Sequence, residues 1–169
     1  NTADSEITPD LQAMANHSRE LDRDDPIASG LQDVFVTNII GTGLRPQSRV
    51  DSPAKAELIE RVFAERKNQL ARAEDITYGE SQALAMYKVI EDGNIFIKRT
   101  KTSASDPVWF EYIEYDRLSK PSDWAGAKGA RCTSGVERDA SGVIVAYWVQ
   151  HAVQNNMGQL KMATDYTRV

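Results

Sequence analysis

The residue pattern changes at Asp92-Gly93, and this change constrains the fold more than any other feature of the sequence. Before this point, apolar residues recur at spacings of three and four, which is typical of amphipathic helices. After it, runs rich in β-branched and aromatic residues are separated by turn-forming pairs, which is typical of strands. Helices followed by strands favour an α+β fold over alternating βαβ units. We therefore expect N-terminal helices packed on a mostly antiparallel β-sheet formed by the C-terminal half.

Helix start and stop signals divide the first half into four helices. Thr8 begins the first, Asp25-Pro26 separates it from the second, Gly41 ends the second, Ser52-Pro53 opens the third, and residues 75–78 open the last. The apolar residues of each helix lie on one face, and in the second helix we expect this face to point inward. In the first two helices these faces are Leu11, Met14, Ala15, Ser18 and Leu21, and then Ile27, Leu31, Val34, Phe35, Asn38 and Ile39; in the third helix the face is Leu58, Val62, Phe63 and Leu70.

Three segments of the second half carry a strand pattern, namely residues 95–97, 108–113 and 143–149. Residues 119–131 contain Pro121 and two glycines and are predicted to form a surface loop. One or two short edge strands are expected around Leu160 and Tyr166.

Length and composition are those of an ordinary soluble globular protein. The chain has 169 residues, 41% hydrophobic and 27% charged, enough for one core. We expect a single domain over residues 1–169, with a helical part at about 8–92 and a sheet part at about 93–169. No apolar run approaches the roughly 20 residues that cross a bilayer. The acidic start without Met indicates a piece of a longer protein.

Several kinds of site are disfavoured by the residues present. The net charge of −5 argues against a nucleic-acid reader. Cys132 is the only cysteine, and His17 and His151 lie in different predicted elements without metal-ligand spacing. Gly41-Thr42-Gly43 follows a helix rather than a strand, which favours a helix stop over a phosphate-binding loop. We expect no catalytic residue, no cofactor and no metal.

A small hydrolase with a site in the sheet region is the alternative. Glu111 and Glu114 point to opposite faces of a strand, whereas Glu114 and Asp116 share one face. Asp116, Glu114 and His151 are therefore the candidate residues for acid/base chemistry. The residues alone favour a structural or interaction protein over this enzyme.

Five residues are candidate subunit or partner contacts. Lys98 and Lys101 belong to the one basic run, and with Arg45 and Arg49 they could meet an acidic partner, as in an adaptor domain. A solvated strand end is the simpler interpretation of this run. Trp124 lies in the glycine-rich loop, and a large aromatic residue on a loop often marks a contact surface.

Motifs in a fixed order resemble lambda-type tailed-phage portal proteins. Residues 19–30 resemble the family's arginine-led helix and its break, with Asp24-Asp25 where the family often has Arg-Asn, and residues 36–46 resemble its Gly-Thr-Gly-Leu turn. Residues 91–97 resemble its helix-to-strand junction, residues 113–118 its Asp-Arg-Leu strand end, and residues 135–149 its hairpin. The resemblance covers about residues 17–150.

The resemblance implies a structural protein without a catalytic site. Subunits of this family form a ring, usually of twelve copies, at the capsid vertex where the tail attaches, and double-stranded DNA passes through it without sequence-specific binding. The implied partners are other copies of the chain, terminase, capsid and head-completion proteins, with no membrane. The implied location is the virion, and the host cytoplasm during assembly. The matched region corresponds to a fragment of the wing, which precedes the stem and clip.

Overall fold

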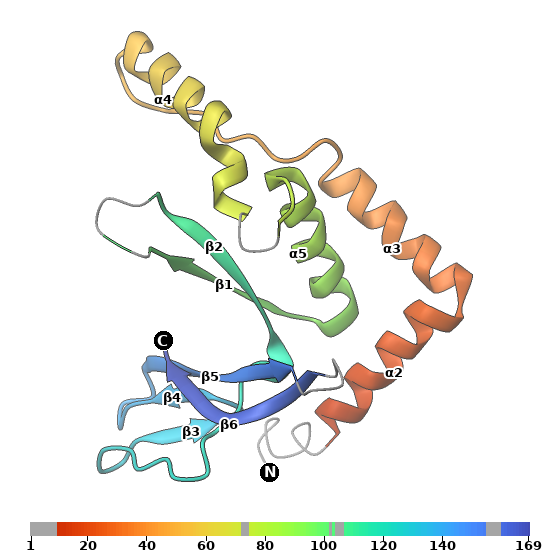
Figure 1. Cartoon of the computed structure of the whole chain (residues 1–169), viewed down its shortest axis with the longest axis vertical. Helices are drawn as coiled ribbons and strands as arrows, with labels where there is room; N and C mark the ends of the chain where they lie inside the picture. The colour runs from red at the N-terminus through yellow and green to blue at the C-terminus, as the bar shows by residue number, and fades with distance from the viewer. Residues whose placement is uncertain (1–9, 72–74, 102, 104–106, 155–159) are drawn as a thin grey trace. The chain divides into compact units, whose positions relative to one another are not determined.

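A computed structural model describes residues 10–71, 75–101, 103, 107–154 and 160–169, with the side chains of residues 152–154 and 160–165 excepted. Contacts divide the chain into two compact units (Figure 1). One unit comprises residues 13–113, and the other comprises residues 1–12 and 114–169. Helices precede strands along the chain, so the expected α+β class is confirmed. The single domain expected from the sequence stays a prediction.

The first unit contains the helices and a two-stranded sheet. Its elements are α2 (Leu11–Asp24), α3 (Pro26–Ile39), α4 (Pro53–Arg66), the 3-10 helix η1 (Lys67–Ala71), α5 (Tyr78–Asp92), β1 (Ile95–Thr100) and β2 (Trp109–Glu114). β1 and β2 pair with each other. Their connection is too short for a parallel crossover, so they form an antiparallel hairpin.

The predicted helix boundaries are confirmed where the structure describes them. The Asp25 side chain accepts a hydrogen bond from Ile27 N at 2.8 Å and caps α3. Thr77 and Glu80 form a capping box at the start of α5, and Gly93 ends that helix with φ of 77°. Gly41, with φ of 53°, follows α3 as the expected stop. The predicted cap at Thr8 lies outside the described residues.

The second unit is built on a four-stranded antiparallel sheet in the order β3-β4-β5-β6. Its strands are β3 (Arg131–Thr133), β4 (Val136–Arg138), β5 (Ile144–Gln154) and β6 (Leu160–Arg168). The predicted edge strands near the end of the chain are thus one strand, β6. The sheet half therefore holds two sheets, and β3 was not predicted because three residues are too few to show a strand pattern.

Strand alternation ends earlier than the sequence suggested. Residues Tyr115–Arg117 form the 3-10 helix η2 immediately after β2. The expectation that Glu114 and Asp116 share a strand face is therefore wrong, because Asp116 is not in a strand.

α5 is the centre of the first unit and contacts α3, η1 and β1. Ser81 of α5 is fully buried, and Tyr112 of β2 donates a hydrogen bond to its hydroxyl at 2.9 Å. A second small core lies in the other unit, where Leu118, Ala146 and Val149 are buried.

The expected inward face of the second helix is wrong, and the apolar face of the first helix is exposed as well. In α2 only Ala15 is buried, and Leu11, Met14 and Leu21 are exposed. α3 buries Gln32 and Val36, followed by Ile40, and its most apolar face is exposed. Apolar periodicity identified a face correctly, but which face a neighbour covers depends on tertiary contacts.

Candidate interaction surfaces

The exposed apolar face of α3 forms a continuous row, here called the α3 stripe. Each member lies three or four residues from another member, which places the row on one side of the helix. They are Ile27, Leu31, Val34, Phe35 and Ile39. Ile27 is 80% exposed, and each of the others is about half exposed. Contiguous apolar surface of this kind marks contact sites more often than chance exposure does.

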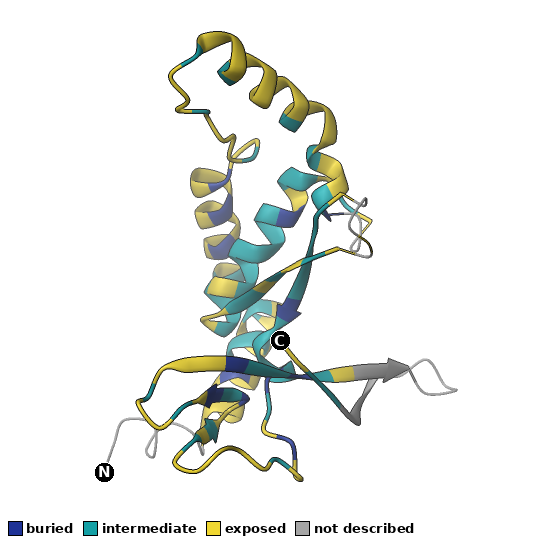
Figure 2. Ribbon diagram, turned by 90° about the vertical axis from the view of Figure 1, so that its left-hand side faces the viewer, coloured by how far each residue is buried: buried dark blue, intermediate teal, exposed yellow. Residues whose placement is uncertain are grey.

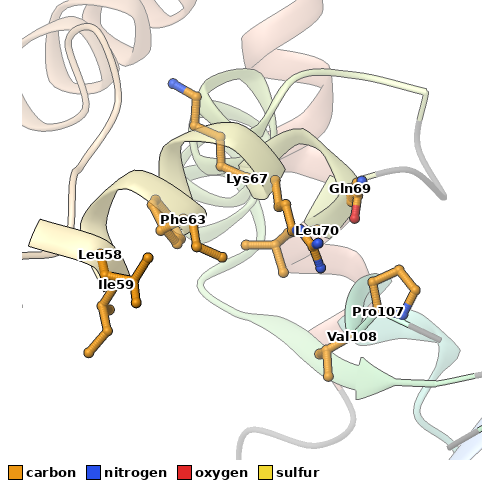
Figure 3. A pocket seen from close by; sticks show the side chains of 10 residues that line it. Leu58, Ile59, Phe63, Lys67, Gln69, Leu70, Pro107 and Val108 are labelled. Atoms are coloured by element: carbon orange, nitrogen blue, oxygen red, sulfur yellow. The ribbon is translucent and has the colours of Figure 1, made fainter. Parts of the chain in front are cut away.

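A second apolar surface lies along α4 and η1. No residue of α4 is buried, and the helix is largely exposed (Figure 2). A groove of about 580 Å³ runs beside it and is here called the α4 groove (Figure 3). Its lining is Leu58, Ile59, Val62, Phe63, Arg66, Lys67, Gln69, Leu70, Pro107 and Val108. The wall is thus drawn from α4, η1 and the two residues that precede β2.

The groove combines an anchored apolar wall with a basic end. The Phe63 ring packs edge-on against Tyr78, with centroids 5.5 Å apart, and this fixes one wall on α5. Arg66 and Lys67 are the charged residues of the lining, and both are basic. Within the described residues, no ion pair joins either of them to a carboxylate.

Polar contacts with α5 hold α3 and the segment that follows it in place. Asp33 of α3 accepts a hydrogen bond from the Tyr87 hydroxyl. This bond, with burial and the negative charges nearby, raises the pKa of Tyr87. After α3, the Gln82 side chain bonds both the N–H and the carbonyl of Leu44, at 2.7 and 3.2 Å. α3 is therefore fastened to α5 on the side that buries Gln32 and Val36, and the stripe stays exposed.

The predicted basic contacts lie in two places within the first unit. Arg45 and Arg49 are exposed in the irregular segment between α3 and α4. Lys98 of β1 is half-buried and pairs with Glu111 of β2 at 3.5 Å, so much of its charge is compensated. Lys101 is exposed just after β1. Their role as contacts stays a prediction.

Trp124 lies in the second unit, in the loop that precedes β3. The Lys120 ammonium sits 5.0 Å from the centre of its ring. A Cβ at Gly126 would come within 2.2 Å of a ring atom, so the loop requires glycine there. The half-buried indole also interacts with the Glu137 side chain of β4, where its hydrogen bond helps to lower the pKa of that carboxyl group. The predicted contact role of Trp124 is untested.

Sequence reasoning missed a buried carboxylate at Glu137 in β4. Glu137 accepts hydrogen bonds from Trp148 Nε1 at 2.8 Å and Arg168 Nε at 3.1 Å. Arg168 first, and then Trp148, hold the pKa of Glu137 below its usual range. The bonds cross from β4 to β5 and β6, so they fasten three strands. No sequence signal pairs these residues, because only the strand register brings them together.

The residues of the hydrolase alternative are placed as follows. Glu114 ends β2, Asp116 lies in η2, and exposed His151 has its Nε2 2.7 Å from Thr167 Oγ1. None of the three lines the α4 groove. Within the described part of the chain, no group of three or more His, Cys, Asp or Glu residues is arranged to hold a metal ion. Burial raises the pKa of the Cys132 thiol, which opposes its use as a nucleophile.

The comparison with family models decides between these interpretations. A model described as phage portal protein, lambda family, matches residues 1–169. The chain belongs to this family. The predicted family is thereby confirmed, and it is a structural family. No curated protein matches the chain, and in the described residues no helix has the length and apolarity to span a membrane.

The segments that resemble portal proteins all fall at junctions of the fold. Residues 25–26 separate α2 from α3, and residues 41–43 form the turn after α3. Residues 91–97 join α5 to β1, and residues 113–118 contain the end of β2. Residues 135–149 form the β4–β5 hairpin. In this portal-family chain, the motifs therefore mark turns and element ends.

Proposed function

We propose that the chain is the wing part of a portal subunit, and that copies of it assemble into a closed ring at one vertex of a phage capsid. Double-stranded DNA is packaged and ejected through this ring, and the tail attaches to it. The observation that carries the proposal is the family match over residues 1–169. The role is structural: terminase supplies the ATPase, and the ring meets terminase, capsid and head-completion proteins during assembly in the host cytoplasm.

Two exposed apolar surfaces support a ring. The α3 stripe and the α4 groove are different surfaces of one unit, and each exposes several large apolar side chains side by side. A cyclic ring of more than two copies requires two different contact surfaces on each subunit. This chain offers such a pair.

The charge of the chain suits a passage that does not hold DNA. Each copy carries a net charge of −5, and a ring of about a dozen copies multiplies this field. Phosphate backbones are repelled rather than bound, so DNA of any sequence can move through the ring. Arg45, Arg49, Lys98, Lys101 and Trp124 are proposed contacts with neighbouring subunits or assembly proteins rather than with DNA.

The test is the assembly state of the protein encoded by the whole reading frame that contains this sequence. Negative-stain electron microscopy is expected to show closed rings with a central hole. In gel-shift experiments at about 0.15 M salt, these rings are expected to bind linear DNA weakly and without sequence preference. A protein that stays monomeric at every concentration and salt condition contradicts the proposal, and so does a reading frame with no terminase gene nearby.

A further inference from the structure

The α3 stripe and the α4 groove are both open in a single chain. Ile27 of the stripe is 80% exposed, and Leu58 and Ile59 of the groove are 48% and 50% exposed. Neither surface covers the other within the chain, because each would then be buried. Among the residues that the structure describes, none covers either surface.

The two surfaces match in length. α3 and α4 each have 14 residues, which corresponds to about 21 Å of helix. The stripe runs from Ile27 to Ile39, along nearly all of α3, and the helical wall of the groove runs from Leu58 to Leu70. A helix of the length of α3 can therefore lie along α4, with the part of its stripe from Ile27 to Leu31 against the groove.

The charges at the ends of the two surfaces are opposite. Exposed Asp24 precedes the start of the stripe, and in the described structure it has no ion-pair partner. Arg66 and Lys67 lie at the C-terminal end of α4, also without a partner carboxylate. Placing Asp24 beside Arg66 and Lys67 sets the two helices antiparallel. The positive end of the α3 dipole then lies beside the negative end of the α4 dipole, which adds to the attraction.

We propose that the α3 stripe of one copy docks, antiparallel, in the α4 groove of the next copy. This inference rests on the proposed ring and names the surfaces that build it. Each copy gives its stripe to one neighbour and its groove to the other, so the contact is head-to-tail, and in a closed ring every copy makes both contacts. Asp24 of one copy pairs with Arg66 and Lys67 of the other and fixes the direction of docking.

The single cysteine of the chain makes a cross-linking test direct. Cys132 is first replaced by Ser, and Leu31→Cys and Ile59→Cys are then made separately in that background. Mixing the two variants under mild oxidation is expected to give a disulfide-linked dimer in several-fold excess over either variant alone. In the matched control, the Leu31→Cys variant is mixed with a Val143→Cys variant, whose cysteine is at a similarly exposed position in the other unit. This mixture is expected to give no excess of disulfide-linked dimer.

A charge swap tests the direction of docking without touching the apolar residues. Asp24→Lys is expected to reduce the cross-linked fraction several-fold, and combining it with Arg66→Asp and Lys67→Asp on the partner is expected to restore it. Leu31→Ser is expected to weaken association about tenfold, because a large apolar side chain is no longer buried.

The outcomes separate this inference from the proposed function. Three results would each overturn the docking mode. They are equal cross-linking of Leu31→Cys with itself, no excess over the Val143→Cys control, and no rescue by the charge swap. Rings seen by microscopy together with any of these results leave the portal assignment standing and the docking wrong. Cross-linking as expected, with no rings from the whole reading frame, supports the contact and contradicts the ring.

Discussion

Arg19 of α2 and Asp92 of α5 form a bidentate ion pair, although 73 positions separate them in sequence. Two guanidinium nitrogens of Arg19 lie 2.7 and 2.8 Å from the two carboxylate oxygens of Asp92. The Asp92 side chain is fully buried. Beside this pair, Ser18 donates a hydrogen bond to the Glu91 carbonyl at 2.6 Å. These contacts fasten the middle of α2 to the last turn of α5. The positive charge of Arg19 there also interacts favourably with the negative end of the α5 dipole.

Removing Arg19 is expected to destabilise the protein more than neutralising its partner. Arg19→Met leaves the Asp92 carboxylate buried without a counter-charge, which costs about 3 kcal/mol of unfolding free energy. Asp92→Asn keeps a hydrogen-bond acceptor and leaves Arg19, which is 22% exposed, able to reach water. Urea denaturation of both variants measures the order, and a larger loss for Asp92→Asn contradicts this account.

Two glycine substitutions are expected to have opposite signs. Gly43 has φ of 98°, and a Cβ there would lie 3.3 Å from the Gly79 backbone. Gly43→Ala is therefore expected to destabilise the protein by more than about 1 kcal/mol. Gly30 lies inside α3 with nothing within 4 Å of its Cβ position, so Gly30→Ala is expected to stabilise it by up to about 1 kcal/mol. Thermal unfolding of the pair checks both signs, and a Gly43→Ala variant as stable as the parent would show that this close approach is not required.

The Glu137 cluster predicts a loss of stability in acid. Hydrogen bonds from Arg168 and Trp148 lower the pKa of Glu137. A carboxyl group with a lowered folded pKa stabilises the fold above its unfolded value of about 4.3 and loses this contribution as pH falls through the folded pKa. The gap in unfolding free energy between the parent and Glu137→Gln is expected to be constant from about pH 7 to 5 and to shrink below about pH 4. Arg168→Gln should weaken that pH dependence, because the main cause of the lowered Glu137 pKa is removed. A free-energy difference between the parent and Glu137→Gln that does not change with pH would contradict this role of Glu137.

The tryptophans allow the two compact units to be followed separately. Trp109 lies in the first unit, and Trp124 and Trp148 lie in the second. We propose that residues 1–169 unfold as a single domain. Fluorescence of Trp109→Phe and of the Trp124→Phe/Trp148→Phe double variant is then expected to give coincident urea midpoints. Separate midpoints identify two domains.

Helix and strand positions could be predicted because their signals are local. Asp25-Pro26, Thr77 and Gly93 act on neighbouring backbone groups, and the structure places element ends at each of them. The short strand β3 escaped prediction because its backbone pairs only through the register with β4. Asp116 was misplaced for a related reason, since the turn into η2 interrupts an apparently continuous strand pattern.

The sequence by itself determined the order of helices and strands, the helix caps and the portal family, because capping, periodicity and motif order are properties of contiguous residues. Tertiary structure decided which face of α3 is buried, which charges pair and which apolar surfaces stay open. Val36 is covered and Leu31 is exposed, although both fit an apolar helical pattern. The difference arises because burial of a residue depends on which element packs against its helix. The element that packs against α3 is α5, and the residues that make this contact are far away in the sequence.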